Sequence, residues 1–385
     1  MKVAIDAVGI RGHGGAAVLF ELLHWLPQVK PDWRWRVFLL GRDLREFNDP
    51  PCEKNVIIEH TLYGNSGLAR LRWVKYQLRE RIKDIGADII LCFANIGSDK
   101  PCVPQVVFVQ QTNAFFDEGI AKHDFLKRLR MKFMRRNILA GARASRAVIV
   151  QTEAMRNRML MYTPQLNGRI HVIPSGFRTP SLNPAIRPKK KALIDSAGRP
   201  RLIYVSHPSE HKNHINLIKA LPNLGKLFSN MQLLLTLEKS NPPNARYASF
   251  IQEITKAARE GGVDNNLVWL GILTPDEVNY GLVNCDLLVF PSLAESFGLG
   301  LVEAMAAGCP IVASDLPFAH DVARDAAVYF DPLSSKNIAE TIVSTLSEKD
   351  AIERMKAAGT RLKEKYSYEN IAYQIAEVLT SAASD

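Results

Sequence analysis

Apolar runs of strand length recur along this chain, and stretches with the composition or period of helices separate most of them. In the first half these runs fall at residues 3–8, 37–40, 56–58, 89–92, 106–109, 148–150 and 171–173. In the second half they fall at residues 201–207, 232–235, 268–270, 286–290, 311–313 and 328–330. Strands that alternate with helices predict a mostly parallel α/β sheet in each half. At 385 residues the chain exceeds what one core usually supports, so we expect two domains.

The clearest pattern lies in DLLVFPSLAESFGLGLVEAMAAGCPIVASD, residues 286–315. Its apolar start predicts a buried strand that ends at Pro291, and the small polar residues that follow predict a loop. Residues 300–307 are rich in helix formers, and Gly308 stands where a glycine typically ends a helix. The apolar run after it predicts the next parallel strand. The short helix should therefore begin at the carboxyl edge of a sheet.

Two carboxylates flank the start of this predicted helix, Glu295 in the loop and Glu303 in the first turns. The backbone amides of residues 297–300 lie between them. The first amides of a helix lack helical partners, the dipole is positive there and glycines admit close approach, so this is a site for phosphate. Because carboxylates repel phosphate, the two glutamates are better suited to accept hydrogen bonds from hydroxyls. A nucleotide-sugar, with phosphates between two hydroxyl-rich groups, satisfies the whole pattern.

Residues 290–312, FPSLAESFGLGLVEAMAAGCPIV, closely resemble the signature of retaining glycosyltransferase family 4. The resemblance is strong over about residues 202–332 and only architectural over the first half. It implies the GT-B fold, in which two Rossmann-like domains face each other across a cleft that holds a nucleotide-sugar donor. We accordingly expect an N-terminal acceptor-side domain at residues 1–175 and a nucleotide-sugar-binding domain at residues 176–366. A C-terminal helix, residues 367–385, is expected to cross back and pack on the first domain.

The resemblance also implies roles for residues of the second domain. Lys212 matches a family lysine that binds the diphosphate, whereas His207 stands where the family has an arginine. Glu295 is expected to accept hydrogen bonds from the transferring sugar, and Glu303 from the ribose hydroxyls. Backbone amides are expected to contact the diphosphate and sugar at Phe297, Gly298, Leu299 and Gly300. We predict Glu295 and Lys212 as catalytic residues and the others as substrate-binding residues.

The first domain offers fewer matches. A glycine loop follows the first strand, and Gly14 and Gly15 match the family loop that faces the donor. Many family members carry a histidine after a middle strand, where this chain has Gln111 and Asn113. We expect Gln111 and Asn113 to bind the sugar, with Gln110 as an alternative, but none of the three can act as a general base near neutral pH. His123, the nearest histidine in sequence, is interpreted as a surface residue.

Transfer from a nucleotide-diphosphate sugar leaves negative charge on the diphosphate, and the site must stabilise that charge. The chain contains no Asp-x-Asp pair, and the histidines at 207, 211 and 214 match no helical zinc motif. We therefore expect no metal and no cofactor, with cationic side chains and helix dipoles in the place of a metal. The resemblance implies retention of the anomeric configuration. Without a general base, the leaving phosphate oxygen is expected to remove the proton of the acceptor.

The expected donor is a GDP-, UDP- or dTDP-linked sugar, and neither the base nor the sugar can be decoded from these residues. Family habit favours a glycan or lipid-linked acceptor in bacterial surface polysaccharide synthesis. Two alternatives belong to other classes. A GT-B relative could carry other chemistry, such as sugar-nucleotide epimerisation. A net charge of +10 also suggests a nucleic-acid-binding protein, but the chain has no zinc finger or evident recognition helix, so no nucleic-acid partner is expected.

Much of the excess positive charge falls in two predicted helices. The first carries Arg70, Arg72, Lys75, Arg79, Arg81 and Lys83, and the second Lys127, Arg128, Arg130, Lys132, Arg135 and Arg136. The first also has an apolar stripe at helical spacing, formed by Leu68, Leu71, Val74, Leu78 and Ile82. This helix is either a solvated face above a core stripe or a surface that docks on an anionic membrane.

An apolar content of 47% and a charged content of 23% are typical of soluble globular proteins. No apolar run approaches membrane-spanning length, and the chain opens directly as a strand, so no secretory signal is expected. Its five cysteines show no metal or redox spacing, and most lie in apolar runs. Free buried thiols suit a reducing compartment. We expect a cytoplasmic protein, with peripheral contact to the inner face of the cytoplasmic membrane as a further option.

Overall fold

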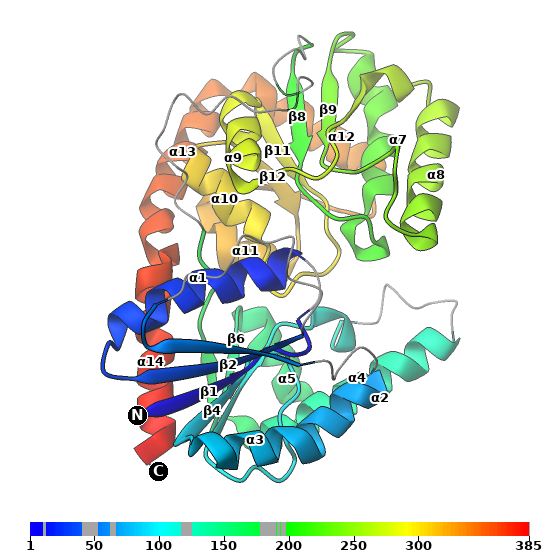
Figure 1. Cartoon of the computed structure of the whole chain (residues 1–385). Coiled ribbons are helices and arrows are strands. Elements are labelled where there is room, and N and C mark those ends of the chain that lie inside the picture. The colour runs from blue at the N-terminus through cyan, green and yellow to red at the C-terminus, as the bar shows by residue number, and fades with distance from the viewer. Residues whose placement is uncertain are drawn as a thin grey trace. The chain divides into compact units, whose positions relative to one another are not determined.

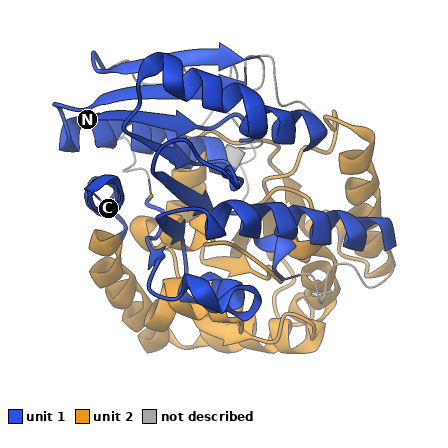
Figure 2. Cartoon of the chain, turned by 90° about the horizontal axis from the view of Figure 1, so that it is seen from below, with its two compact units in different colours: residues 1–176, 366–385 blue, residues 177–365 orange. Residues whose placement is uncertain are grey.

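The computed structural model (Figure 1) describes residues 1–10, 13–40, 53–61, 67–116, 125–177, 190, 193 and 198–384. The chain divides into two compact units, which Figure 2 distinguishes by colour. Unit 1 comprises residues 1–176 and 366–385, and unit 2 comprises residues 177–365. Each unit is built on one parallel sheet with helices, which confirms the α/β class expected from the alternating pattern.

Within the described part of unit 1, seven parallel strands form a sheet in the order β3-β2-β1-β4-β5-β6-β7. Their bounds are β1 (Lys2–Asp6), β2 (Arg34–Leu40), β3 (Val56–Thr61), β4 (Ile89–Cys92), β5 (Gln105–Val109), β6 (Ala147–Val150) and β7 (Ile170–Val172). The chain runs from β1 outward to β3 and then returns to β4 on the other side of β1. The topological switch point of this sheet therefore lies between β1 and β4.

The helices of unit 1 include the last helix of the chain. They are α1 (His13–Val29), α2 (Gly67–Arg72), the π-helical η1 (Trp73–Gln77), α3 (Leu78–Ile85), the short η2 (Thr112–Ala114), α4 (Phe125–Arg143), α5 (Glu153–Tyr162), η3 (Pro164–Leu166) and α14 (Tyr368–Ser384). Helix α14 packs against α1, β4 and β5. Because α1 begins at His13, Gly14 and Gly15 lie in its first turn and not in the loop expected before it.

The first basic helix pattern turns out to cover the core of unit 1. Val74, Leu78 and Ile82 are buried in that core, whereas Leu68 is 73% exposed, so most of the stripe packs inside unit 1, as the interpretation of a solvated face above a core stripe requires. Arg70 also departs from the expected basic face, because it is buried and donates to the carboxylate of Asp6 at 2.9 and 2.7 Å. Asp6 ends β1 fully buried, and a buried carboxylate needs such a partner.

In unit 2, the described residues form a sheet of six parallel strands in the order β10-β9-β8-β11-β12-β13. Their bounds are β8 (Arg201–Tyr204), β9 (Gln232–Leu235), β10 (Leu267–Trp269), β11 (Leu287–Phe290), β12 (Ile311–Ser314) and β13 (Val328–Phe330). The chain proceeds from β8 to β10 and then returns to β11 on the other side of β8. The switch point of this second sheet lies between β8 and β11.

The remaining elements follow the strands of unit 2. They are η4 (Glu210–Lys212), α7 (His214–Gly225), α8 (Ala245–Glu260), η5 (Asp264–Asn266), α9 (Pro275–Asn284), α10 (Leu299–Ala307), α11 (Pro317–Ala323), η6 (Arg324–Ala326), α12 (Ser335–Ser347), α13 (Lys349–Lys363) and η7 (Glu364–Tyr366). The helix expected to open at residues 211–214 begins at His214, so Lys212 lies in the 3-10 turn before it.

The cysteines and the helix lengths bear on the expected environment. Cys92, Cys285 and Cys309 are buried free thiols and Cys102 is half-buried, while Cys52 lies outside the described residues. Among the helices that the structure describes, none combines the length and the apolar character needed to cross a bilayer.

Candidate active site

The loops that carry Lys212 and Glu295 follow β8 and β11, the two neighbouring strands at the switch point of unit 2. In open α/β sheets, ligands bind at the carboxyl ends of the strands where the order reverses. The side-chain amine of Lys212 donates to Oε1 of Glu295 at 2.5 Å, and the two side chains are 18% and 13% exposed. The structure thus brings together the two residues that the sequence predicted as catalytic.

Hydrogen bonds across the switch point fix these two loops against each other. The amide of Leu293 donates to the carbonyl of His211 at 2.7 Å. The side-chain amide of Asn213 donates to the carbonyls of Pro291 at 3.0 Å and Pro332 at 2.7 Å. Asn213 has φ 58° and ψ 32°, a left-handed conformation that asparagine adopts more readily than most residues. The backbone that presents Lys212 is therefore held by partners from two distant parts of the chain.

A buried tyrosine, Tyr204, also contacts both loops. The Tyr204 hydroxyl, at the end of β8, donates to the carbonyl of Lys212 at 2.8 Å and lies 3.0 Å from Oγ of Ser292. The amine of Lys212 also lies 5.8 Å from the centre of the Phe290 ring, within range of a cation–π contact. Backbone and side chain of Lys212 are both positioned by residues at the ends of β8 and β11.

Helix α10 begins at the same edge, directly after the loop that carries Glu295. Its N-cap residue is Gly298, with φ 97° and ψ 62°, and within the described structure no side chain caps the helix. A Cβ atom at Gly300 would lie 3.2 Å from the Phe290 ring, so glycine allows the helix to start close to β11. The amide of Leu301 donates to the carbonyl of Gly298 at 2.9 Å, so the amides of Leu299 and Gly300, with the positive dipole end of α10, are the groups offered to an anion here.

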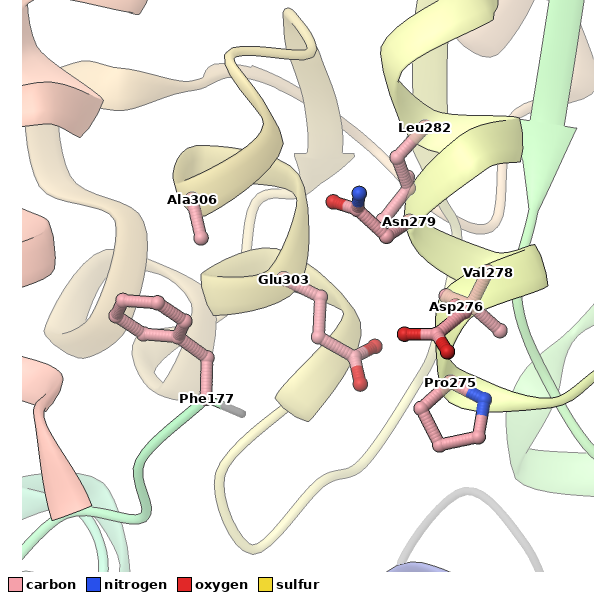
Figure 3. Close-up of a pocket in the computed structure, with 8 residues that line it drawn as sticks. All are labelled: Phe177, Pro275, Asp276, Val278, Asn279, Leu282, Glu303 and Ala306. Carbon is pink, nitrogen blue, oxygen red and sulfur yellow. The ribbon is translucent and has the colours of Figure 1, made fainter. Parts of the chain in front are cut away.

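Glu303 lies one turn further along α10, in a pocket shared with α9 (Figure 3). The pocket is lined by Phe177, Pro275, Asp276, Val278, Asn279, Leu282, Glu303 and Ala306. Burial raises the pKa of Glu303 to about 7, so the side chain carries only part of its charge near neutrality. Figure 3 shows the carboxylates of Glu303 and Asp276 pointing toward one another from the two helices.

Asp276 and Asn279 were not predicted from the sequence as site residues. A signal for their placement was present, because Thr274-Pro-Asp-Glu277 forms a capping box that begins α9. The Thr274 hydroxyl accepts from the Glu277 amide at 3.3 Å, and the Glu277 carboxylate accepts from the Thr274 amide at 3.0 Å. The box fixes the start of α9 and thereby places Asp276 in its first turn.

The histidines near Lys212 occupy different environments. His214 is buried, its Nε2 lies 2.8 Å from Oγ of Ser206, and burial lowers its pKa to about 3, with further lowering by the charge of Lys212. His207, which stands where the family has an arginine, is exposed and stacks on the ring of Tyr247 at 5.8 Å. Among the described residues, no group of three or more His, Cys, Asp or Glu side chains could hold a metal ion.

The predicted residues of unit 1 lie after β1 and β5. Asn113 lies in η2 just beyond β5, and its side-chain oxygen is buried without a hydrogen-bond partner among the described residues. Gln111 precedes it and is half-buried. The only other unit 1 candidates, Gly14 and Gly15, lie at the start of α1. His123 lies outside the described residues.

Comparison with known proteins identifies the family of the second half. Residues 186–362 match the family described as glycosyl transferases group 1. Lipopolysaccharide 1,2-N-acetylglucosaminetransferase of Salmonella typhimurium is 27% identical over 214 residues, which are 54% of this chain and 55% of that protein. Phosphatidyl-myo-inositol mannosyltransferase of Mycobacterium leprae is 30% identical over 215 residues, 55% of this chain and 54% of that protein. The chain thus spans about half the length of these curated relatives.

Solved structures resemble the whole chain in fold. Sucrose-phosphate synthase from Thermosynechococcus elongatus superposes with a TM-score of 0.75 at 17% identity, covering 100% of this chain and 99% of that one. Anabaena HepE in complex with UDP and glucose gives a TM-score of 0.75 at 19% identity, covering 99% and 100%. The fold and the family match agree with each other. Residues 186–362 of this chain match the glycosyl transferases group 1 family, and the chain has the GT-B fold.

Proposed function

We propose that this protein transfers a sugar from a nucleotide-diphosphate donor to a glycan or lipid-linked acceptor in bacterial surface polysaccharide synthesis. The observation that carries the proposal is the contact between Lys212 and Glu295 at 2.5 Å, beside the uncapped start of α10. A relative named as a lipopolysaccharide N-acetylglucosaminetransferase and another named as a phosphatidyl-myo-inositol mannosyltransferase support the acceptor class. HepE, solved with UDP-glucose, supports a nucleotide-sugar donor.

The proposed chemistry divides between cationic and anionic groups. When the anomeric bond breaks, negative charge grows on the leaving diphosphate, and the amine of Lys212 and the first amides of α10 stabilise it. A lysine amine has three N–H donors, so Lys212 can keep its contact with Glu295 while it binds a phosphate oxygen. Because these N–H groups are held in place before the nucleotide-sugar binds, little reorganisation is needed as the charge develops.

The two glutamates of the signature bind the hydroxyl-rich ends of the donor. Glu295 accepts hydrogen bonds from the transferring sugar, and its carboxylate lies next to the cation that holds the phosphate. Glu303 accepts from the ribose hydroxyls in the pocket between α9 and α10. A carboxylate has two acceptor oxygens, which suits the two neighbouring hydroxyls of a ribose.

Retention and metal independence are parts of the proposal that rest on the sequence signature and the absence of an Asp-x-Asp pair. The proton of the acceptor is proposed to pass to the leaving phosphate oxygen on the same face of the sugar. Product anomer assignment by NMR and transfer rates with and without a chelator test these two parts. An inverted product, or activity that depends on added divalent metal, contradicts them.

The central experiment measures donor binding and transfer separately. A thermal-shift panel of GDP-, UDP- and dTDP-sugars identifies the donor, because a ligand that binds the native state raises the transition temperature. Nucleotide release is then measured with and without acceptor, and formation of epimerised donor without net release of nucleotide supports the epimerase alternative. Glu295→Gln should retain the thermal shift and lose most of the transfer rate.

Asp286→Asn provides a matched control. Asp286 pairs with Arg199 at 3.1 Å at the amino end of β11, the opposite end of the strand that leads to Glu295. Asp286 also accepts from the Arg201 amide at 2.6 Å, a bond that an asparagine side-chain oxygen can keep. The same change from carboxylate to amide should therefore leave the transfer rate within about twofold there, because exposed ion pairs contribute little. Full transfer by Glu295→Gln contradicts the role assigned to Glu295, and a wild type that transfers no sugar from any of these donors contradicts the proposed function.

A further inference from the structure

Helix α4 carries an exposed apolar stripe in its first half. Four large side chains there are largely exposed: Phe125 (76%), Leu126 (74%), Leu129 (54%) and Phe133 (52%). Single apolar residues scattered over a surface are ordinary, but four on neighbouring turns of one helix form a continuous patch. With a rise of 1.5 Å per residue, the stripe extends roughly 12 Å along the helix.

Basic side chains border this stripe on both sides. At 3.6 residues per turn the four apolar residues occupy a sector about 100° wide. Arg128 and Lys132 follow one border of that sector, Arg130 follows the other, and Arg136 lies beyond its end. All four cations are exposed, and the sequence of α4 contains no acidic residue. The face is therefore apolar along its centre and positive at its edges.

The second half of α4 anchors the helix in unit 1. Ile138, Leu139 and Ala142 are buried there, and the Arg135 guanidinium donates to the carbonyl of Ala114 at 3.0 Å and to the hydroxyl of Tyr162 at 3.1 Å. Figure 1 shows the first turns of α4 extending away from the strands of unit 1. The stripe is thus held out on a helix whose other end is fixed in the core.

We propose that residues 125–136 of α4 form a docking surface for an anionic lipid bilayer, on which this half of the helix lies in the plane of the membrane. Apolar side chains of such a helix enter the boundary between headgroups and acyl chains, and flanking cations bind lipid phosphates. This inference deepens the proposed function, and rests on it for the choice of partner, since a lipid-linked acceptor is presented at such a surface. It places membrane contact on α4 and not on the α2–α3 segment suggested by the sequence.

A nucleic acid is the competing occupant, because it also attracts a basic surface. It accounts for the arginines but not for the stripe, since Leu126 and Leu129 would gain nothing from a phosphate backbone and cannot stack on bases as aromatic rings do. A bilayer satisfies the apolar centre and the charged borders together. The composition of the face therefore favours lipid.

Vesicle co-sedimentation of the full chain tests the proposal. The wild type should bind phosphatidylcholine vesicles that contain about a third phosphatidylglycerol, with an affinity that falls as salt rises, and should bind pure phosphatidylcholine weakly. Leu129→Ser/Phe133→Ser and Arg128→Glu/Arg130→Glu should each lower the partition coefficient at least about tenfold. If the first pair disturbs folding, Phe125→Ser/Leu126→Ser changes the two most exposed positions instead.

Lys75→Glu/Arg79→Glu is the matched control, because it makes the same charge change on an exposed face of unit 1 beside Val74, Leu78 and Ile82, which are buried. It should lower vesicle binding less than about threefold. Three results would overturn the proposal. The control could lose as much vesicle binding as Arg128→Glu/Arg130→Glu, or Leu129→Ser/Phe133→Ser could bind vesicles as well as the wild type. RNA could also displace the wild type from vesicles through an interaction that requires the same apolar residues. The thermal shift of the wild type with nucleotide-sugars is measured in parallel. If the wild type binds vesicles but shows no thermal shift with any nucleotide-sugar, the proposed function is contradicted and the docking surface is not.

Discussion

At the scale of single residues, Lys212 and Glu295 depend on each other. Each is largely shielded from water, with 18% and 13% of its side chain exposed, and each is the ion-pair partner of the other. Removing one side chain leaves a poorly hydrated charge unpaired, which costs more than removing both. A loss of activity in one variant therefore has to be separated from a loss of stability.

Lys212→Met should lower the transfer rate by about a hundredfold to a thousandfold, the usual cost of removing one donor that stabilises developing negative charge. Lys212→Arg keeps the charge but not the geometry of an amine, so it should restore only part of the rate. The double variant Lys212→Met/Glu295→Gln should be more stable than Lys212→Met alone while remaining inactive. Denaturant unfolding and nucleotide release measure the two effects. An active Lys212→Met variant refutes the assigned role.

The buried carboxyl of Glu303 gives unit 2 a pH dependence of stability. Burial raises its pKa to about 7, whereas an exposed glutamate titrates near about 4.3. Between these values the native state binds more protons than the unfolded chain, so the contribution of Glu303 to stability falls as pH rises and is lowest above pH of about 7. Glu303→Gln should remove this dependence and be the more stable form above neutrality. Urea unfolding across that range measures it, with the exposed Glu340→Gln as control.

Donor affinity should follow the opposite trend. Ribose hydroxyls donate more strongly to a charged carboxylate than to its neutral form, so binding should improve as pH rises through about 7. In Glu303→Gln the affinity should be lower and almost independent of pH over that range. Calorimetric titration of the donor at several pH values measures both. A wild type whose affinity does not change with pH shows that Glu303 does not bind the donor in its charged form.

At the scale of elements, the sequence predicted the strands well because apolar runs bounded by proline, glycine or polar residues leave few alternatives. Strands β4, β9 and β13 occupy the predicted residues, and α10 starts one residue before the predicted position. The turn that presents Lys212 was not predicted. Its left-handed residue, Asn213, is held by carbonyls 78 and 119 residues away, and local patterns contain no information on such partners.

The N-terminus of α10 depends on a backbone conformation that favours glycine. Gly298 has φ 97°, and a Cβ atom there would lie 3.2 Å from Leu301 and 3.5 Å from the Phe290 ring. Gly298→Ala should lower the free energy of unfolding by about 1–2 kcal/mol and weaken donor binding, since the amides of α10 would shift. Gly308 ends the same helix with φ 69° in open space. Gly308→Ala should therefore cost similar stability and leave donor binding unchanged; an equal loss of binding in both variants contradicts this.

At the scale of the whole molecule, the sequence gives the net charge, but not which of its basic helices has an exposed apolar face. The net charge of +10 and the two basic segments were evident in the sequence, but Val74, Leu78 and Ile82, which form most of the first segment's apolar stripe, lie in the core. The exposed stripe of α4 was not predicted, because only the structure distinguishes apolar residues that are buried from those that are exposed. Residue periodicity alone cannot make that distinction, since both helices are amphipathic.

The last helix of the chain belongs to the core of the first unit. Helix α14 comes last in sequence, yet it buries Ile371, Ile375 and Leu379 and packs on α1, β4 and β5 of unit 1. Ile375→Ala should therefore lower the stability of unit 1 by about 2–5 kcal/mol, the usual cost of such a truncation. Ile342→Ala, in α12 of unit 2, removes an equally buried side chain from the other core.

A nucleotide-sugar that binds through Lys212 and Glu303 stabilises unit 2 by mass action. If the units unfold in separate steps, Ile375→Ala lowers the transition that the donor does not raise, and Ile342→Ala lowers the one that it does. Scanning calorimetry of both variants with and without donor measures these shifts. The reverse assignment would mean that α14 stabilises the donor-binding unit, and a single transition that both variants lower equally would mean that the two cores unfold as one cooperative unit.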